Sequence, residues 1–370
     1  MHSPDFSQVQ TPALLIDMPT VARNIARCAA YAREAGVALR PHIKTHKLPR
    51  LARMQLDAGA CGLTCAKVSE AEVMADAGMT DLFIAHAIIG APRLARVMRL
   101  ARRANLILGI DSAVGADMLQ SAAQSAGLIC RVRLEIDTGL LRTGVPIAES
   151  AALARHILAL PNLQLDGIYT FKTTNLDGQA TADTAAAGAQ EGALLKQCAD
   201  LLRAQGIAVP HVSGGSSPTG RYVARMPGIT EVRPGTYIYN DCMQTTLGAA
   251  TWDDCAATVL ATVVSTPQPG LAIVDAGSKA LSTDSVLGAP PYFLRGWGHI
   301  LGRDDLTLAR LYEEHGILTG PADMGLTIGQ QLRIVPNHVC VAVNLYNEAL
   351  LIEADGALTP TRIAARGCSQ

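Results

Sequence analysis

A lysine between two histidines is the first feature of the sequence whose residue types could do chemistry. Lys44 lies in the segment 40–47 with His42 and His46 on either side, and it follows the short apolar run 36–39, which is typical of a buried strand. In α/β proteins, residues just past the carboxyl end of a strand commonly form the functional site. A lysine amine is a nucleophile only when neutral, and burial beside cationic groups favours the neutral form. We therefore expect His42, His46 and Lys47 to act on Lys44 in this way; the alternative is a basic loop that contacts solvent or a phosphate.

A second candidate is the glycine-rich segment 213–220, which follows the apolar run 209–212. Gly214 and Gly215 would let the backbone approach an anion closely, and the hydroxyls of Ser216 and Thr219 add hydrogen-bond donors. Loops after the late strands of barrels commonly hold phosphates; the alternative is a flexible surface turn. An amine for a Schiff base and an anion site for a phosphate ester are together what pyridoxal phosphate requires.

A third candidate is Arg142, which lies a few residues after the predicted strand 130–136. Its planar fork of donors could bind a phenolate or a carboxylate. The alternative is a turn closed by an ion pair between Asp137 and Arg142.

A histidine and a cysteine two positions apart form a fourth candidate. On a strand, His338 and Cys340 would project from the same face. One imidazole and one thiolate suit zinc, and two ligands leave positions open for water or substrate, as catalysis needs. The alternative is a buried cysteine beside a hydrogen-bonded histidine. The segment 313–315 could add a carboxylate of Glu313 or Glu314 and the imidazole of His315, or could form an exposed polar turn.

The elements that must position these residues alternate between strand and helix along the first two thirds of the chain. Such alternation predicts an α/β fold with a parallel sheet, and the number of repeats predicts a (β/α)8 TIM-type barrel. A doubly wound open sheet is the alternative, although no GxGxxG follows the first strand. The predicted strands are 11–17, 36–39, 62–65, 82–85, 106–109, 130–136, 165–171, 209–213 and 229–232, and the predicted helices are 17–34, 48–58, 68–77, 91–104, 114–126, 147–159 and 183–205.

After about residue 245 the pattern changes to short β-type runs separated by Gly/Pro turns, which predicts a smaller, mostly β domain. We expect the barrel to span 11–245 and the β domain 246–370, with residues 1–10 as a candidate extension of the latter. The β-type runs are 256–264, 271–274, 331–334, 339–343 and 350–352.

Bulk composition excludes several classes of protein. The 370 residues carry a net charge of −1 and 17% charged residues, which argues against disorder and against a nucleic-acid surface. No apolar run approaches the roughly 20 residues that span a bilayer, and no secretory signal is visible. Nine cysteines without a CxxC pair predict reduced thiols and a cytoplasmic protein.

Taken together, the motifs resemble the D-threonine aldolase/D-serine dehydratase family of alanine-racemase-like, fold type III pyridoxal phosphate enzymes. The resemblance covers nearly the whole chain, in order. It implies a barrel followed by a β domain, in a homodimer whose two chains complete each site. It is carried by the segments 11–17, 40–47, 137–145, 213–219, 233–237, 313–316 and 336–340.

The resemblance also implies roles for single residues. Lys44 matches the Schiff-base lysine, and Arg142 matches the arginine that faces the phenolic oxygen of the cofactor ring. His338 and Cys340 match a pair that holds a divalent metal, with zinc expected first and manganese, magnesium or cobalt as alternatives. The residues that match the cofactor-holding loops are Gly214, Gly215, Ser216, Thr219, Gly235, Thr236 and Tyr237.

The family resemblance implies a lyase that acts on a small β-hydroxy D-amino acid. A His-x-Cys pair is similar to the dehydratase type, whereas aldolases more often show His-x-Asp. We therefore predict elimination to a 2-oxo acid and ammonia. The alternative is retro-aldol cleavage to glycine and an aldehyde; an amino-acid racemase, a non-catalytic cofactor-binding protein and a metal-free sugar-phosphate barrel enzyme are further alternatives.

The chain departs from the family pattern in the segment 169–174, where the family usually carries a tyrosine and a histidine-containing stretch. Phe171 replaces the tyrosine and Lys172 introduces an amine. Lys172 is a candidate second base, or a lysine that is held by a salt bridge or binds a carboxylate. Asp275, Lys279 and Asp284 have no assigned role at this level.

Overall fold

The computed structural model describes residues 4–370, which form two compact units. We call residues 27–235 and 368–370 the barrel unit, and residues 4–26 and 236–367 the β unit. The boundary between the units lies inside helix α1 (Met18–Glu34). None of the helices in the described part of the chain is long and apolar enough to cross a membrane.

The barrel unit contains eight parallel strands in the order β2-β12-β11-β8-β6-β5-β4-β3. The two ends of this path are joined, because Leu39 O accepts from Cys61 N–H and Pro41 O accepts from Thr64 N–H. The predicted (β/α)8 barrel is thus confirmed. The strands are β2 (Ala38–Leu39), β3 (Leu63–Cys65), β4 (Asp81–Ala87), β5 (Asn105–Ile110), β6 (Cys130–Asp137), β8 (Leu163–Tyr169), β11 (His211–Gly214) and β12 (Glu231–Val232), while the short β7 (Val145–Pro146) pairs only with β6.

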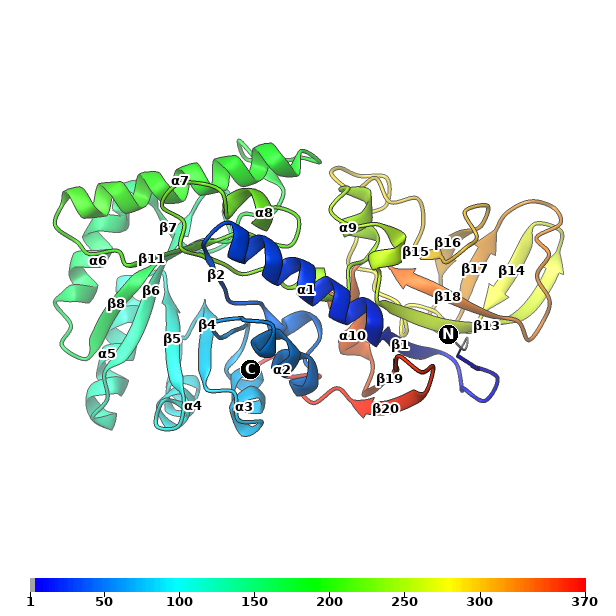
Figure 1. Ribbon diagram of the computed structural model, residues 1–370, viewed down its shortest axis with the longest axis horizontal. Helices are drawn as coiled ribbons and strands as arrows, with labels where there is room; N and C mark the ends of the chain where they lie inside the picture. The colour runs from blue at the N-terminus through cyan, green and yellow to red at the C-terminus, as the bar shows by residue number, and fades with distance from the viewer. Residues whose placement is uncertain (1–3) are drawn as a thin grey trace. The chain divides into compact units, whose positions relative to one another are not determined.

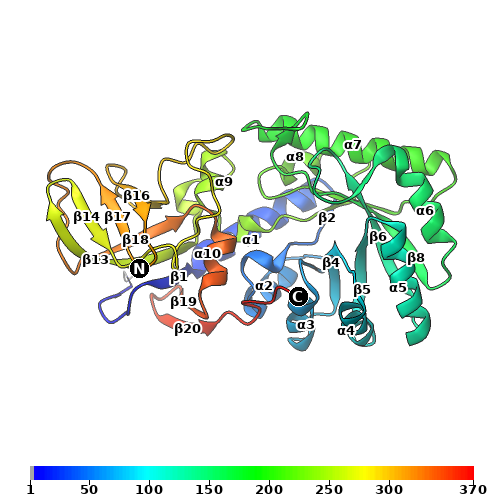
Figure 2. The ribbon, with the colours of Figure 1, turned by 180° about the vertical axis from the view of Figure 1, so that it is seen from behind.

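Helices lie on the outer side of these strands, as Figures 1 and 2 show for α3, α4 and α5. Helix α5 is capped at both ends, since Ser112 accepts from Gly115 N–H and Gly127 ends the helix at φ +66°. The helices are α2 (Pro49–Asp57), α3 (Val68–Asp76), α4 (Ala91–Ala101), α5 (Ala113–Ala126), α6 (Ser150–Leu158), α7 (Thr184–Ala204) and α8 (Gly220–Val223); a small hairpin, β9 (Asn175–Leu176) and β10 (Gln179–Ala180), precedes α7.

A network of charged side chains fills part of the barrel interior. Glu231 accepts from Arg133 at 2.5 Å and from Arg40 at 2.9 Å, and Arg133 also donates to Asp166 at 2.9 Å. Arg133 is only 1% exposed. Buried charges of this kind are tolerated because each one is paired and hydrogen-bonded.

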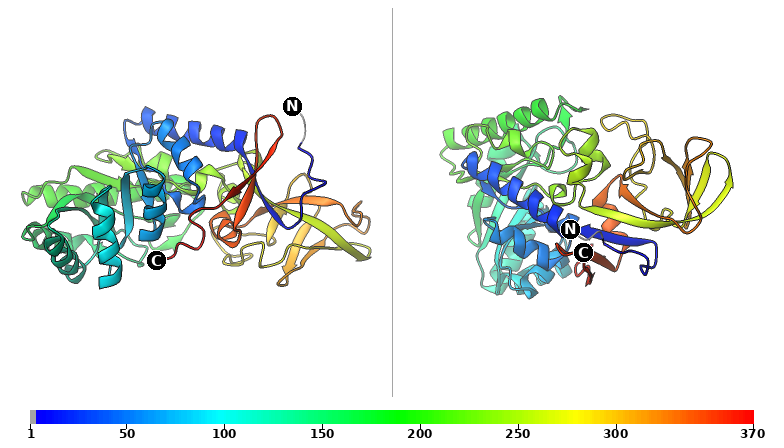
Figure 3. Two further views of the ribbon diagram at one scale, coloured as in Figure 1. Left: turned by 90° about the horizontal axis from the view of Figure 1, so that it is seen from below. Right: turned by 45° about the vertical axis from the view of Figure 1, so that its right-hand side comes forward.

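The β unit is built on β13 (Ala257–Gln268), a long strand that pairs with β1, β14 and β18. Figure 3 shows β1 alongside the β19–β20 hairpin. The prediction of a mostly β second domain is confirmed. The other strands are β1 (Ala13–Asp17), β14 (Leu271–Val274), β15 (Gly298–Ile300), β16 (Thr307–Leu311), β17 (Gly316–Thr319), β18 (Gln331–Pro336), β19 (Glu348–Ile352) and β20 (Leu358–Arg362), and the helices are α9 (Cys242–Thr246) and α10 (Val339–Leu345).

Strand β1 does not belong to the barrel, although the sequence predicts it as the first barrel strand. Leu15 pairs with Thr258 of β13 and with Leu350 of β19, so β1 lies inside the sheet of the β unit. The eight strands from β2 to β12 already close the barrel and leave no position for a ninth. As a result, the barrel unit begins at residue 27, and not at residue 11 as expected from the sequence.

The segment 339–343 was expected to be a strand, and this prediction is wrong. It forms helix α10, whose first N–H, that of Val339, donates to the buried carboxylate of Asp241 at 3.0 Å. β-Branched residues favour strands only weakly, and a side chain that caps the helix from elsewhere in the fold outweighs that preference here.

Candidate active site

Lys44 lies on a single 3-10 turn, η1 (Ile43–Thr45), that follows β2. The turn is capped by His42, whose Nδ1 accepts from the backbone N–H of Lys44 at 3.3 Å. The amine of Lys44 lies 5.5 Å from the centre of the Phe171 ring. A side chain that follows β2 thus meets one that follows β8.

The two histidines beside Lys44 are neutral and fix the shape of the turn. Burial, then the charges of Lys44 and Arg233, hold the pKa of His42 well below 6.5. Burial likewise lowers the pKa of His46 to about 4; its Nδ1 accepts from Leu48 N–H at 3.1 Å and its Nε2 lies 3.2 Å from Gln55 Oε1. The expectation that His42 and His46 are cationic neighbours of Lys44 is therefore wrong, because charged imidazoles are costly in this buried setting.

Lys47 does not supply an uncompensated charge either. Its amine forms a buried ion pair with Glu70 at 2.9 Å. The carboxylate of Glu70 thus offsets the positive charge by which Lys47 was expected to act on Lys44.

Arg142 shares the Phe171 ring with Lys44. Its guanidinium carbon lies 4.8 Å from the ring centre. Asp137 does not form the alternative turn ion pair with Arg142. Its carboxylate instead accepts from the N–H groups of Gly139 and Leu140 at 2.9 and 3.1 Å. Arg142 and the amine of Lys44 therefore both lie over the ring of Phe171. This role of Phe171 was not predicted from the sequence.

The glycine-rich segment after β11 forms a tight loop. Gly215 has φ +81°, and a Cβ at this position would lie 2.9 Å from Gly220 Cα, so only glycine fits. The N–H of Ser216 donates to Thr219 Oγ1 at 3.0 Å, and the two hydroxyls lie 2.8 Å apart. A tight loop of glycines and small hydroxyl side chains after a barrel strand is the type of segment that can form a cradle for a phosphate group.

The segment after β12 connects this loop to the turn of Lys44. Pro234 O accepts from His42 N–H at 2.9 Å, and Gly235 N–H donates to Ser217 Oγ at 3.2 Å. A Cβ at Gly235 would lie 3.0 Å from His42 Cβ. The strands β2, β12, β11, β8 and β6 are consecutive neighbours, so their carboxyl ends bring the predicted amine, loops and arginine to one side of the barrel.

Two further basic residues of the barrel unit, Lys172 and Arg233, follow the carboxyl ends of β8 and β12. Lys172 is 1% exposed and its amine donates to the carbonyl and side-chain oxygens of Asn175; burial lowers its pKa, against the attraction of Glu191 and Asp177. Arg233 donates to Ser213 Oγ and Thr170 O, both at 2.5 Å. Sequence reasoning did not single out Arg233, although its place just before Pro234-Gly235 was a signal.

The β unit brings the predicted metal pair together with Asp284. His338 immediately precedes α10, Cys340 lies in the first turn of this helix, and His338 Nδ1 lies 2.6 Å from Asp284 Oδ2. Burial opposes the charged form, but the hydrogen bonds with Asp284 and Cys340 raise the pKa of His338 to about 11. Thr236 Oγ1 lies 3.7 Å from Cys340 Sγ, and Thr236 and Tyr237 share the 3-10 turn η3 (Thr236–Ile238).

The donor types at this place fit a divalent metal. An imidazole whose Nδ1 donates to a carboxylate can offer Nε2 to a metal once the Nε2 proton has left, and this arrangement orients histidine ligands in metalloproteins. A thiol is the second donor, so zinc suits the pair. Residues 4–370 contain no group of three or more His, Cys, Asp and Glu side chains arranged as a complete metal site, so water or substrate would have to fill the other positions.

The remaining candidates have structural roles. Glu313 and Glu314 form exposed ion pairs with Lys279 at 3.1 and 2.6 Å, in the turn between β16 and β17, so the segment 313–315 is an exposed polar turn. Asp275 accepts from Thr11 Oγ1 at 2.5 Å and from Thr262 N–H at 2.8 Å, which ties the segment before β1 to β13.

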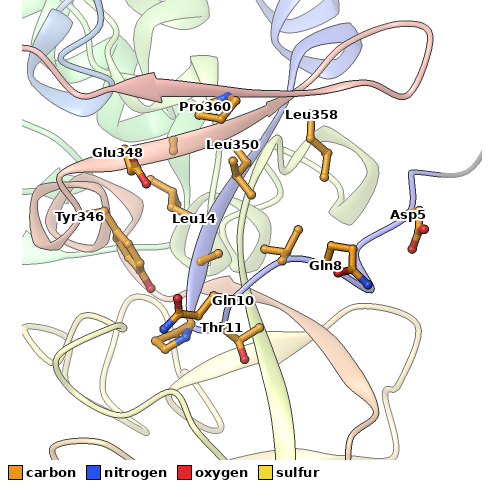
Figure 4. Close-up of a pocket in the computed structure, with 14 residues that line it drawn as sticks. Asp5, Gln8, Gln10, Thr11, Leu14, Tyr346, Glu348, Leu350, Leu358 and Pro360 are labelled. Atoms are coloured by element: carbon orange, nitrogen blue, oxygen red, sulfur yellow. The ribbon is translucent and has the colours of Figure 1, made fainter.

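A cavity of about 610 Å³ lies within the β unit, between the amino-terminal segment, β1 and the β19–β20 hairpin. Figure 4 shows Thr11, Tyr346 and Glu348 along its wall. It contains none of the predicted site residues, so this cavity is separate from the metal pair.

Comparison with known proteins shows which family the two parts of the chain resemble. Residues 16–242 match the family described as alanine racemase, N-terminal domain, and residues 256–352 match the putative serine dehydratase domain. The chain is 35% identical over 367 residues to D-threo-3-hydroxyaspartate dehydratase of Delftia sp. (strain HT23), covering 95% of this chain and 96% of that one. It is 33% identical over 372 residues to a D-threonine aldolase of Arthrobacter sp., covering 98% and 94%.

Solved structures agree. D-threonine aldolase from Filomicrobium marinum superposes with a TM-score of 0.89 at 29% identity and covers 100% of both chains. D-threo-3-hydroxyaspartate dehydratase has been solved as an alanine variant of a histidine and as an alanine variant of the cysteine two positions later; the cysteine variant, described as metal-free, has a TM-score of 0.88 at 33% identity and covers 98% of this chain and 99% of that one. The chain therefore belongs to the D-threonine aldolase/D-serine dehydratase family of alanine-racemase-like pyridoxal phosphate lyases.

Proposed function

We propose that this protein is a pyridoxal phosphate- and divalent metal-dependent lyase that eliminates water from a β-hydroxy D-amino acid, after which hydrolysis of the resulting enamine yields a 2-oxo acid and ammonia. The observation that supports it most is the meeting of Lys44 and Arg142 on the ring of Phe171, beside a glycine-rich loop. An amine, a planar cation and a phosphate cradle on neighbouring strand ends are what this cofactor needs.

Each residue of the barrel unit would have a defined task. Lys44 would hold the aldehyde carbon of the cofactor and, once displaced by substrate, take the α-proton at Nζ. Arg142 would face the phenolic oxygen, and Phe171 would support one face of the ring. The cofactor, when bound, would withdraw electrons from the α-carbon of the substrate. The segments 214–219 and 235–237 would hold the phosphate ester and the ring.

The residues of the β unit would act on the β-hydroxyl. His338 and Cys340 would hold the metal, and Asp284 would fix the imidazole through Nδ1. The metal would supply Lewis acidity that favours departure of hydroxide. A relative with a histidine and a cysteine at the same spacing has been solved with that cysteine replaced, in a form described as metal-free, which supports this assignment.

Retro-aldol cleavage to glycine and an aldehyde is the second candidate, because relatives that cover almost the full chain carry the aldolase name. Both reactions need the same amine and metal; they differ in whether the C–O or the Cα–Cβ bond breaks. The His-x-Cys pair, shared with a relative named as a dehydratase, favours elimination.

Three finer assignments complete the proposal. We propose zinc as the metal, since a thiol and an imidazole are the donors. A homodimer would complete the site, which sedimentation equilibrium of the purified chain would test. A cytoplasmic location suits nine cysteines that are all free.

The reaction is tested by incubating the purified protein, loaded with pyridoxal phosphate and zinc or manganese, with D-serine, D-threonine and D-3-hydroxyaspartate. We expect a 2-oxo acid and ammonia in equal amounts, and no reaction with the L-enantiomers. Glycine and an aldehyde would establish the aldolase instead. Inversion at the α-carbon without loss of substrate would contradict both.

A further inference from the structure

A buried carboxylate lies directly behind the glycine-rich loop. Glu191 of α7 is 0% exposed, its Oε1 accepts from Gly215 N–H at 2.7 Å, and its Oε2 accepts from Thr219 Oγ1 at 3.3 Å. These two contacts reach both ends of the loop. A negative group so close to a predicted phosphate cradle is unexpected, because it opposes the binding of an anion.

Helix α7 is shaped to bring this carboxylate close. Gly188 and Gly192 lie on either side of Glu191 along the helix, and both face the segment after the loop. A Cβ at Gly188 would lie 2.8 Å from Tyr222 Cβ, and one at Gly192 would lie 2.4 Å from Met226 Cγ. Glycine inside a helix is destabilising relative to alanine, so two glycines here indicate that close approach of α7 to the loop is required.

The glycine-rich loop also has a glycine, Gly214, where it packs against α7. A Cβ at Gly214 would lie 2.6 Å from Leu195 Cδ1 and 3.1 Å from Glu191 Oε1. Gly215, at φ +81°, directs its N–H to Glu191. The carboxyl group therefore determines which backbone donors of the loop remain for a ligand.

The charged groups that face Glu191 come from two other strand ends. Arg233 follows β12 and Lys172 follows β8, and both attract the carboxylate; Asp177 lies near Lys172 and offsets part of its charge. Burial nevertheless dominates and raises the pKa of Glu191 to about 7, against the hydrogen bond from Gly215 and the attraction of Arg233. The group can thus carry or lose its proton near neutral pH.

We propose that Glu191 is the positioning residue of the phosphate loop and that it takes up a proton when the phosphate ester of the cofactor binds. This inference rests on the proposed function, since it assumes that the loop holds pyridoxal phosphate. The protonated carboxyl keeps one oxygen as the acceptor for Gly215 N–H, and its O–H can donate to Thr219 Oγ1. Both contacts persist while the repulsion between carboxylate and phosphate is removed.

The sign of the pH dependence follows from this arrangement. The pKa of Glu191 is above its ordinary value, and a nearby dianion raises it further. Cofactor affinity is then highest where Glu191 is protonated and falls as the pH rises through the pKa of the free protein. Ionisation of the phosphate itself acts on affinity too, but equally in any variant at position 191.

The test uses the full chain after removal of bound cofactor, with pyridoxal phosphate as the probe and its Kd measured by absorbance titration. In Glu191→Gln the side chain keeps an acceptor for Gly215 N–H and a donor for Thr219 Oγ1 but cannot ionise. We expect the ratio of wild-type Kd to variant Kd to rise about tenfold between about pH 6 and about pH 8.5. Pyridoxal, which lacks the phosphate, should show a constant ratio.

Two control variants separate the effect of the position of Glu191 from the effect of its charge. Asp200→Asn removes a carboxylate from the exposed face of the same helix and should leave the ratio at one across the range. Glu191→Ala removes the anchor and should weaken pyridoxal phosphate binding at every pH by at least about tenfold, as expected for loss of buried hydrogen bonds. Folding of each variant is checked by its circular dichroism spectrum, and proton uptake by calorimetry of the wild type in buffers of different ionisation enthalpy.

The outcomes are distinct. A ratio that stays flat, with no proton uptake on binding by the wild type, overturns the role of Glu191 while the proposed function stands. Failure of the wild type to bind pyridoxal phosphate at any pH overturns both. A ratio that rises for pyridoxal as strongly as for pyridoxal phosphate also contradicts the inference, because the effect would then not come from the phosphate.

Discussion

The hydroxyl of Thr236 lies 3.7 Å from the thiol of Cys340. Thr236 begins the turn that follows Pro234-Gly235, where the cofactor loops are predicted, and Cys340 is one half of the predicted metal pair. Within the β unit, a residue of the predicted cofactor site thus contacts a residue of the predicted metal site. This contact gives a physical reason why loss of the metal should affect catalysis at the cofactor, and it motivates the first prediction.

Replacing Cys340 by alanine should remove the metal and leave the cofactor. The thiol is one of two protein donors, so we expect the bound metal to fall below one tenth of the wild-type content and turnover to fall at least about 100-fold, the upper end of what loss of an outer-sphere partner costs. Atomic emission and the absorbance of bound cofactor measure the two effects. Cys368→Ala, in the barrel unit, is the matched control; a fully metallated and active Cys340→Ala would mean that the thiol is structural.

Replacing Asp284 by asparagine should weaken metal binding without abolishing it. The amide can still accept from His338 Nδ1 but carries no charge, so the imidazole is held less firmly. We expect metal affinity to fall about 10–100-fold, measured by competition with a chromophoric chelator. Asp355→Asn changes an exposed turn of the same unit and should have no effect; equal affinities in both variants would exclude Asp284 as the orienting group.

Replacing Phe171 by alanine should weaken cofactor binding by about tenfold. The ring lies 5.5 Å from the Lys44 amine and 4.8 Å from the Arg142 guanidinium, and each such contact contributes about 0.5–1 kcal/mol at a partly exposed site. Phe171→Tyr keeps the ring and should bind as the wild type does. If the alanine variant retains full affinity, Phe171 does not support the cofactor ring.

Replacing Glu231 by glutamine should destabilise the barrel unit. Its carboxylate is the shared partner of Arg133 and Arg40, and removal of one partner from a buried ion pair costs about 3–5 kcal/mol. Urea denaturation measures the free energy of unfolding; Glu149→Gln, at an exposed position of the same unit, should change it by less than about 0.5 kcal/mol.

The contribution of Glu231 should depend on pH in one direction. Burial alone would raise its pKa, but Arg133 and Arg40 outweigh this and lower it to about 2, below the value of about 4.3 in the unfolded chain. Its stabilising effect is therefore full above about pH 4.3 and is lost as the pH falls through about 2. The wild type and Glu231→Gln should converge in stability in acid; a difference that persists at pH 2 would contradict the assignment.

Much of the fold was predictable because its signals are local. Strand and helix alternation identified the barrel and nearly all its elements, and a run such as Leu271–Val274 between turns was found with its bounds. The position of β1 was not predictable, since its apolar pattern fits a buried strand in either unit and only its pairing with β13 decides. Helix α10 was missed because the capping carboxylate, Asp241, lies almost one hundred residues earlier.

The site residues that could be predicted were likewise those whose signals are local in the sequence. The resemblance identified Lys44, Arg142 and the His338–Cys340 pair, because these lie in motifs that are continuous in sequence. The neutral state of His42 and His46, the ion pair of Lys47 with Glu70, and the contact of Asp284 with His338 depend on burial and on distant partners. Glu191 carried no sequence signal at all, since a glutamate on a helix is usually exposed.

The most direct test of the account is to locate the lysine that holds the cofactor. The purified protein is reduced with borohydride, digested, and its peptides are sequenced by mass spectrometry, with Lys44→Ala treated in parallel. We predict a single pyridoxyl phosphate label on Lys44 and none on the variant. A label on Lys172 or on any other lysine, or no label on the wild type, would contradict the assignment of this site.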